Sequence, residues 1–227
     1  MAKSFVLTFL KKEKIARDTY SFYFDKSNYD LKFNPGEYIQ MKLEIKNPDS
    51  RGSSRYFTIA APPLDTHLII TTKVIRSSFK KSLLKLEKNK DVRFFGPMGN
   101  FVMNRKDKRT KVFLAGGIGM TTFYSMIKFA HQKKDKGKII LITSFSSPDF
   151  YIYKEELEKI SKENPNINVF YTTSRIDEKI IRKHVDDIFD KSFYVVGSEK
   201  MVEDTKNILL KMKIPEESIS LEDFTGY

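Results

Sequence analysis

The sequence predicts a two-domain α+β protein, in which an antiparallel β-barrel or sandwich is followed by an α/β domain with a parallel sheet. In about the first hundred residues apolar and polar side chains alternate, as across 39–45 (Ile-Gln-Met-Lys-Leu-Glu-Ile). From about residue 110, short apolar runs alternate with amphipathic helical segments. A period of two indicates half-buried strands, and the second pattern indicates a parallel sheet with helical crossovers. We expect the domains at 1–104 and 105–227.

Turn residues divide the first half into strands. Alternation predicts strands near 5–9, 20–24 and 39–45. Residues that favour turns separate the apolar runs, at Asn34-Pro35-Gly36, Asn47-Pro48-Asp49, Pro62-Pro63 and Gly96-Pro97. One helix is predicted from Ser78 to Lys88, because Phe79, Leu83 and Leu86 fall near one helical face.

The second half carries the elements of a parallel sheet. Four apolar runs predict its strands, at 112–115, 139–142, 169–171 and 193–196. Between the first two, Phe123, Ile127 and Ala130 share one helical face, and Gly137 closes that segment. The polar stretch from Asn104 to Lys111 is expected to join the domains.

Composition excludes several classes of protein. The chain has 227 residues and no cysteine, so disulfides, thiolate metal sites and cysteine nucleophiles are absent. Any redox chemistry therefore needs a bound organic cofactor. The N-terminal segment lacks an apolar stretch of signal-peptide length, and no run is long enough to span a membrane, so a cytoplasmic protein without a membrane partner is expected.

The net charge of +12 favours anionic ligands or acidic proteins without choosing among them. Lysines are scattered instead of forming an arginine-rich stripe, which favours a solvated surface over a nucleic-acid face. The histidines His67, His131 and His184 are isolated and show no metal-ligand spacing, so no metal site is expected. The sequence also has no nucleophile elbow.

Three motifs are candidates for ligand binding. The segment 115–123 (Ala-Gly-Gly-Ile-Gly-Met-Thr-Thr-Phe) falls where a strand should end and a helix begin, which suits a pyrophosphate, although tight turns need glycine for other reasons too. On a presumed strand, Arg55, Phe57 and Thr58 offer charge, a stacking ring and a hydroxyl. The third motif is the turn Gly96-Pro97-Met98-Gly99.

The order of these motifs resembles that of the ferredoxin-NADP reductase superfamily, in its single-chain type without an iron-sulfur domain. The resemblance extends over nearly the whole chain, from Pro35-Gly36-Glu37-Tyr38 to the final segment 214–227. It implies an FAD-binding domain at 1–104 and an NAD(P)-binding domain at 105–227. It also implies flavin contacts, with Arg55 on the pyrophosphate, Phe57 against the isoalloxazine and Thr58 near the reactive ring nitrogen. The full set of expected flavin contacts is Arg55, Tyr56, Phe57, Thr58, Thr72, Lys73, Ser77, Ser78 and Phe79.

The resemblance likewise implies a nicotinamide pocket. Its expected residues are Gly116, Gly117, Gly119, Thr121, Gly197 and Met201. Ser174 and Arg175 follow a strand end, where they would bind a 2′-phosphate and favour NADP over NAD.

The C-terminus supplies further candidates. Phe224 and Tyr227 are both candidates to cover the flavin, and Glu222 is expected to assist proton movement. The expected catalytic residues are thus Thr58, Glu222 and Tyr227.

Three features depart from the family pattern. Phe57 replaces a common tyrosine, and Thr122 stands where proline is common. The segment Val196-Gly197-Ser198 replaces Cys-Gly-Pro, which removes a thiol beside the nicotinamide. Hydride transfer does not require that thiol, because the protein mainly positions the two rings.

The expected function is transfer of hydride from NAD(P)H to FAD, with electrons passing to a separate acceptor such as ferredoxin or flavodoxin. A basic surface suits an acidic acceptor through steering that weakens with salt. One alternative is a free-flavin or ferric reductase with small diffusible acceptors. Another is a nonenzymatic nucleotide- or nucleic-acid-binding protein, which would be colourless when pure.

Overall fold

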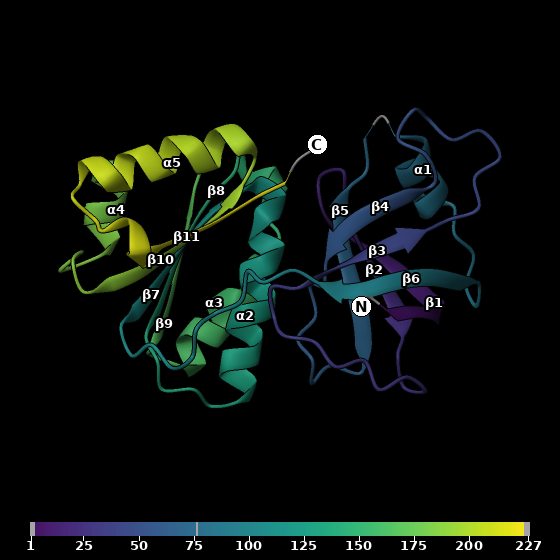
Figure 1. Ribbon diagram of the computed structural model, residues 1–227, viewed down its shortest axis with the longest axis horizontal. Coiled ribbons are helices and arrows are strands. Elements are labelled where there is room, and N and C mark those ends of the chain that lie inside the picture. The colour runs from purple at the N-terminus through teal and green to yellow at the C-terminus, as the bar shows by residue number, and fades with distance from the viewer. Residues whose placement is uncertain (1–2, 76, 225–227) are drawn as a thin grey trace. The chain divides into compact units, whose positions relative to one another are not determined.

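The computed structural model describes residues 3–75 and 77–224, and these form two compact units. Unit 1 is Met1–Val102 and unit 2 is Met103–Tyr227 (Figure 1). An antiparallel sheet in unit 1 precedes a parallel α/β sheet in unit 2, which confirms the predicted fold class. The division falls two residues before the position that the sequence predicts.

Unit 1 is a six-stranded antiparallel sheet with the order β4-β3-β6-β1-β2-β5. Its strands are β1 (Lys3–Ala16), β2 (Thr19–Asp25), β3 (Tyr38–Lys42), β4 (Ser54–Thr58), β5 (His67–Lys73) and β6 (Asp91–Met98), and its helix is α1 (Ser78–Leu84). The edge strands β4 and β5 approach each other just beyond β4, where the Ala60 amide donates to the Ile69 carbonyl at 2.9 Å. The sheet is therefore nearly closed on itself.

Phenylalanine rings fill the inside of unit 1. Phe24 of β2 meets Phe94 of β6 edge to face, with ring centroids 5.1 Å apart, and Phe9 of β1 lies 5.5 Å from Phe24. All three rings are buried. Each such side chain contributes about 1.5–3 kcal/mol when it leaves water. The alternation in the sequence thus marks the residues that face this core.

Unit 2 is a five-stranded parallel sheet with the order β11-β10-β7-β8-β9. Its strands are β7 (Thr110–Gly116), β8 (Ile139–Ser144), β9 (Ile167–Thr172), β10 (Lys191–Gly197) and β11 (Ile219–Asp223). Its helices are α2 (Met120–Gln132), α3 (Lys154–Glu163), α4 (Glu178–His184) and α5 (Glu199–Lys211), with short 3-10 turns η1 (Gly117–Gly119), η2 (Pro148–Phe150) and η3 (Glu216–Ser218).

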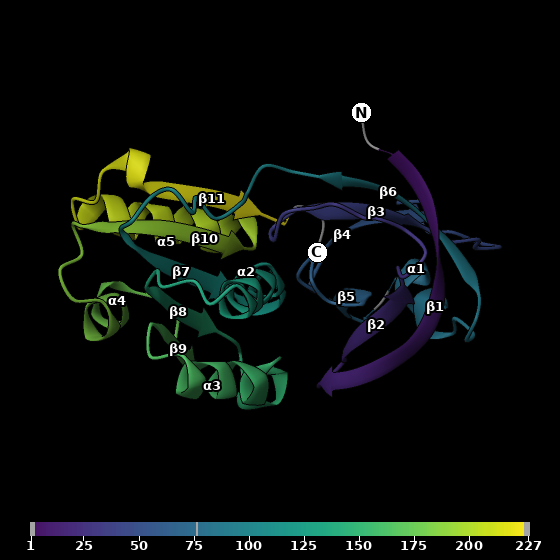
Figure 2. The same cartoon turned by 90° about the horizontal axis from the view of Figure 1, so that it is seen from below.

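Helices cover both faces of this sheet (Figures 1 and 2). On one face, Phe123 of α2 stacks on Phe113 of β7 at 4.4 Å, and α3 joins α2 through a hydrogen bond from the Tyr124 hydroxyl to Glu156. On the other face, α4 and α5 pack on Leu114 and Val195. A strand buried on both faces reads as a continuous apolar run, which is why the sequence located β7 and β10.

The segment predicted to join the domains is anchored within unit 2. The Asn104 amide donates to the Tyr194 hydroxyl at 3.1 Å, and Arg105 forms an ion pair with Asp135 at 3.0 Å. Asp107 accepts hydrogen bonds from the Arg109 guanidinium, and these lower its pKa well below the usual range. Arg109 extends this network by donating to Ser218.

Candidate functional site

Arg55 of β4 is the centre of a cationic cluster in unit 1. Its Nη1 donates to the carbonyls of Arg51, Gly52 and Ser54 at 2.7–2.9 Å, and its Nη2 lies 2.7 Å from Asp49 Oδ1. The side chain is 12% exposed. These bonds hold the guanidinium against the turn that precedes β4, so its position is set by backbone geometry rather than by solvent.

Asp49 connects this arginine to the start of α1. Its Oδ2 accepts from the Ser78 amide at 3.2 Å and from the Ser77 hydroxyl at 3.5 Å, while its own amide donates to Ser78 Oγ at 3.0 Å. Although burial opposes ionisation, hydrogen bonds from Ser78, the Arg51 amide and Arg55 lower the pKa of Asp49 to about 2. The carboxylate is therefore charged at any ordinary pH.

The positive charge of the cluster exceeds what Asp49 neutralises. Burial and then the charges of Arg51, Arg55 and Lys73 lower the pKa of Lys80 to about 8. Lys80 is 8% exposed and belongs to the first turn of α1. The charges of Arg51, Arg55 and Lys73 thus act on Lys80, while Asp49 pairs with Arg55, and this excess of positive charge favours an anion.

One donor of the cluster lacks an acceptor. Among the residues that the structure describes, Arg55 Nε is buried and has no hydrogen-bond partner. A buried donor of this kind requires an explanation, and an anion supplied by a ligand is one. Together with Lys80 and Ser77, it offers donors of the kinds that bind phosphate groups in proteins.

The two aromatic residues of β4 have different surroundings. Phe57 is 3% exposed and packs in the core of unit 1, with its ring centroid 5.9 Å from that of Phe79. Tyr56 is 58% exposed and lies edge-on to Tyr38. The exposed stacking surface of this strand is thus the Tyr56 ring, and the flavin contact expected of Phe57 stays a prediction.

Other residues predicted to contact flavin lie on the neighbouring elements. Thr58 ends β4 and is half-buried, and Lys73 ends β5. Thr72 is fully buried, and its Oγ1 has no hydrogen-bond partner among the described residues. Ser77, Ser78 and Phe79 lie together at the start of α1. The structure thus brings together Arg55, Lys73, Ser77 and Ser78, whereas the Thr72 side chain is buried.

The glycine-rich segment forms the predicted strand-to-helix turn of unit 2. Gly116 ends β7, η1 follows, and α2 begins at Met120. Gly117 has a φ of +53°, which favours glycine. A Cβ on Gly119 would lie 2.9 Å from the Val196 carbonyl oxygen, so this position has no room for a side chain. Thr121 is buried, and its hydroxyl donates to the Ile118 carbonyl at 2.9 Å.

Met201 covers the ends of two adjacent strands. A Cβ on Gly197, at the end of β10, would lie 2.7 Å from its sulfur, and one on Gly116 would lie 3.2 Å from its Cγ. Ser198 caps α5 by accepting from the Met201 amide. The structure therefore brings Gly116, Gly197 and Met201 together at the carboxyl edge of the sheet, where ligands of open α/β sheets bind.

The predicted ribose-reading residues follow β9. The Ser144 hydroxyl at the end of β8 donates to the Ser174 carbonyl at 2.7 Å, and the Ser174 amide donates to Thr172 Oγ1 at 3.0 Å. Arg175 is exposed. Ser174 is therefore held in place at the same edge of the sheet, whereas Arg175 is a solvated charge.

Glu222 and Phe224 lie at the end of β11. Glu222 pairs with Val196 in the parallel ladder, and the Phe224 amide donates to the Gly197 carbonyl at 2.9 Å. Burial, and then the charge of Asp223, raise the pKa of Glu222 to about 7. This value suits a group that exchanges protons near neutral pH. Tyr227 lies outside the described residues.

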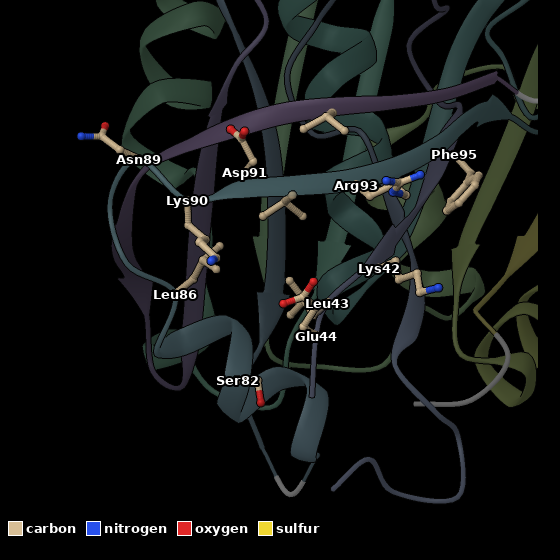
Figure 3. Close-up of a pocket in the computed structure, with 12 residues that line it drawn as sticks. Lys42, Leu43, Glu44, Ser82, Leu86, Asn89, Lys90, Asp91, Arg93 and Phe95 are labelled. Atoms are coloured by element: carbon tan, nitrogen blue, oxygen red, sulfur yellow. The ribbon is translucent and has the colours of Figure 1, made fainter. Parts of the chain in front are cut away.

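A groove of about 910 Å³ opens on unit 1 between α1, β3 and β6 (Figure 3). Its lining includes Lys42, the last residue of β3, and Glu44, two residues further along the chain. From β6, Asp91, Arg93 and Phe95 contribute to it. None of the predicted flavin residues belongs to its lining. Its charges are of both signs, and they indicate no single class of ligand.

Neither a metal-binding cluster nor a membrane-spanning helix occurs in residues 3–75 and 77–224. No group of three or more histidine, aspartate or glutamate side chains there is arranged to hold a metal ion. No helix in that part of the chain has both the length and the apolar character needed to cross a membrane.

Sequence reasoning missed Asp49 and Lys80 as site residues. Asp49 was visible only as the end of the Asn47-Pro48-Asp49 turn, and Lys80 only as one of many lysines. The signal available was the charge pattern of Arg51, Arg55, Lys73 and Lys80. These four residues are recognised as one cluster only when the fold places β4, β5 and α1 side by side.

Comparisons with known proteins agree with this arrangement. Residues 113–207 match the model of the oxidoreductase NAD-binding domain. A flavohemoprotein of Bacillus subtilis is 22% identical over 98% of the chain and 59% of its own length. Methane monooxygenase component C of Methylosinus trichosporium is 26% identical over 61% of the chain and 40% of its own length. The chain thus spans less than two thirds of these relatives.

Solved structures share the fold of the whole chain. The ferredoxin-NADP+ reductase of Plasmodium falciparum superposes on this chain with a TM-score of 0.79 at 17% sequence identity. The matched region covers 98% of this chain and 97% of the reductase chain. The chain is therefore similar in fold to this reductase, and residues 113–207 are similar to the oxidoreductase NAD-binding domain.

Proposed function

We propose that this chain is an NAD(P)H-dependent flavoprotein reductase that binds FAD in unit 1 and passes its electrons to a separate acceptor. The observation that carries the proposal is the cationic cluster, in which buried Arg55 Nε lacks an acceptor and the charges of Arg51, Arg55 and Lys73 act on buried Lys80. Such a site favours a phosphate-bearing ligand. A flavin, when bound, accepts two electrons from NAD(P)H and releases them singly or together.

On this proposal the residues of unit 1 hold and orient the flavin. Arg55 and Lys80 pair with its phosphates, and the Ser77 hydroxyl and the Ser78 amide donate hydrogen bonds to them. Tyr56 offers an exposed ring for stacking, and Thr58 offers a hydroxyl to the ring system. Phe57 and Phe79 support the strand and the helix from the core.

Unit 2 would hold the nicotinamide nucleotide. A Cβ on Gly117 would have no neighbour within 4 Å, so its absence leaves the backbone open to the pyrophosphate, while Gly119 lets the turn pack against Val196. Ser174 and Arg175 would bind the 2′-phosphate of NADP, which favours NADPH over NADH. Gly116, Gly197 and Met201 would line the nicotinamide side.

Glu222 is proposed to hold the exchangeable proton. Its carboxyl is half-buried and its pKa is about 7, so protonated and ionised forms coexist at neutral pH. Phe224 and Tyr227 remain the candidates to cover the flavin ring.

The acceptor is proposed to be an acidic electron-transfer protein such as ferredoxin or flavodoxin. The charge of +12 supports steering of an anionic partner. Among the relatives, methane monooxygenase component C bears the name of one part of a multicomponent enzyme. Electron transfer should slow as ionic strength rises, whereas a free-flavin or ferric reductase with small acceptors should be insensitive to salt.

The test is an absorption spectrum of the purified chain, before and after reconstitution with FAD. We expect flavin bands near 375 and 450 nm (roughly), and bleaching under anaerobic conditions by NADPH more readily than by NADH. Well-folded protein that takes up no flavin when FAD is in excess would contradict the proposal, and would favour a nonenzymatic nucleotide-binding protein.

A further inference from the structure

The Asp49 carboxylate lies where the cationic cluster would place the phosphate of a ligand. It accepts hydrogen bonds from Arg55 Nη2 at 2.7 Å, the Ser78 amide at 3.2 Å, the Arg51 amide at 3.1 Å and the Ser77 hydroxyl at 3.5 Å. These are donors of the kinds that bind phosphate oxygens in proteins. Asp49 thus makes the contacts of a bound anion, although it belongs to the protein itself.

The surrounding cations show that this internal anion is insufficient. Arg51, Arg55 and Lys73 still act on Lys80, whose pKa falls to about 8. Arg55 Nε remains buried without a partner. A pyrophosphate carries more charge and more acceptor oxygens than one carboxylate, so it could also accept from Arg55 Nε, which Asp49 leaves without a partner.

Asp49 and a flavin phosphate cannot both occupy the space between Arg55 and Ser78. Two anions that accept from the same donors repel each other. The guanidinium of Arg55 has only a few N–H groups, so Asp49 and a phosphate would compete for them. Asp49 belongs to a turn, closed by the Gly52 amide donating to the Asp49 carbonyl at 2.8 Å, that separates β3 from β4. A surface turn of this kind can move without disrupting the sheet.

We propose that Asp49 is an internal competitor for the phosphate position of the flavin, and that its carboxylate must leave Arg55 and Ser78 before a flavin nucleotide binds. This inference rests on the proposed flavin site. Asp49 then lowers the affinity for phosphorylated flavins, because only the fraction of molecules with the turn withdrawn is competent to bind. Riboflavin, which has no phosphate, does not require this displacement.

The experiment is a flavin titration of the flavin-free full chain, followed by quenching of flavin fluorescence. The Asp49→Asn variant keeps the size of the side chain and removes its charge. We expect it to bind FAD and FMN about tenfold more tightly than the wild type, with riboflavin unchanged. Asp30→Asn is the matched control, because Asp30 also loses one negative charge in unit 1 but is 82% exposed and pairs only weakly with Lys32 at 3.3 Å. It should change none of the three affinities.

Unchanged or weaker binding of FAD by Asp49→Asn overturns the inference, since Asp49 would then be a bystander or an organiser of the site. An equal gain for riboflavin also overturns it, because the effect would not involve the phosphate. The Arg55→Ala variant separates this failure from failure of the proposed function. Loss of Arg55 should weaken FAD binding by about 10- to 100-fold. If it does not, the flavin site itself is misplaced and both proposals fall.

A measurement on the wild type covers the case in which Asp49→Asn fails to fold. The Gly52 amide closes the turn that carries Asp49 by donating to the Asp49 carbonyl, and it is not among the donors at the phosphate position. If FAD displaces this turn, hydrogen exchange of the Gly52 amide should accelerate on addition of FAD, observed by NMR. Unchanged or slower exchange overturns the inference.

Discussion

The two units offer an anionic ligand opposite kinds of site. In unit 1 the cluster around Arg55 consists of charged side chains, and a carboxylate of the same chain already engages them. In unit 2 the turn after β7 consists of glycines, and its usefulness lies in the absence of side chains. The first site thus depends on charges that one carboxylate of the chain engages, whereas the turn of unit 2 has no room for a Cβ at Gly119.

The Gly119→Ala substitution should have the largest effect. Its Cβ would lie 2.9 Å from the Val196 carbonyl oxygen, and a backbone atom within a sheet cannot move cheaply. We expect a loss of about 3 kcal/mol in the free energy of unfolding, measured by urea denaturation, together with weaker NADPH binding. Gly137→Ala is the control, because its nearest neighbour is the Asp135 side chain at 3.3 Å. Equal stability of the two variants would mean that shape is not what the turn of unit 2 requires.

Glu222→Gln should change how stability depends on pH. The folded pKa of about 7 lies above the ordinary value of 4.5, mainly because of burial, so the folded state retains a proton that the unfolded state has lost. The stability contributed by the protonated carboxyl is present below pH 4.5 and is lost as the pH rises to about 7. The full shift corresponds to about 3 kcal/mol, and because solvent screens the partly exposed carboxyl, the difference in unfolding free energy between variant and wild type should change by about 2 kcal/mol across this window. A pH-independent difference would contradict the assignment.

Arg55→Lys tests whether the site in unit 1 depends on charge alone. Lysine keeps the positive charge but cannot donate at once to three carbonyls and Asp49. We expect FAD binding to weaken about tenfold in a fluorescence titration. Arg93→Lys on β6 makes the same exchange at an exposed position and should be silent. If Arg55→Lys binds FAD normally, simple charge suffices.

Arg175→Ala should have the smallest effect, because Arg175 is exposed. An exposed charge pair with the 2′-phosphate contributes little, so we expect the KM for NADPH to rise about threefold while that for NADH is unchanged. Arg182→Ala, which removes an exposed arginine paired with Glu178 on α4, serves as the control in steady-state assays. Parallel changes for NADPH and NADH would indicate that Arg175 does not read the 2′-phosphate.

The strands of unit 2 were predictable because burial on both faces leaves an apolar run. Strand β11 was not located, since Ile219–Asp223 is an edge strand with three exposed residues and carries no such run. The helix predicted from Ser78 to Lys88 ends at Leu84, where the Lys85 amide closes the last turn. Local periodicity does not encode such endings.

The site residues divide in the same way. The glycine turn and Arg55 stood out in the sequence, because few residue types can approach a phosphate so closely or carry a permanent charge. The core position of Phe57 and the exposure of Tyr56 depended on which face of β4 meets α1. The raised pKa of Glu222 depended on burial that no local pattern shows.

By itself, the sequence determined the two-unit organisation, the direction of each sheet and the glycine turn, because periodicity and backbone permissiveness are local properties. Only the tertiary structure decided that Asp49, Arg55, Ser78 and Lys80 form one electrostatic unit. These residues come from a turn, a strand and a helix, and Coulomb interactions depend on distance in space rather than along the chain.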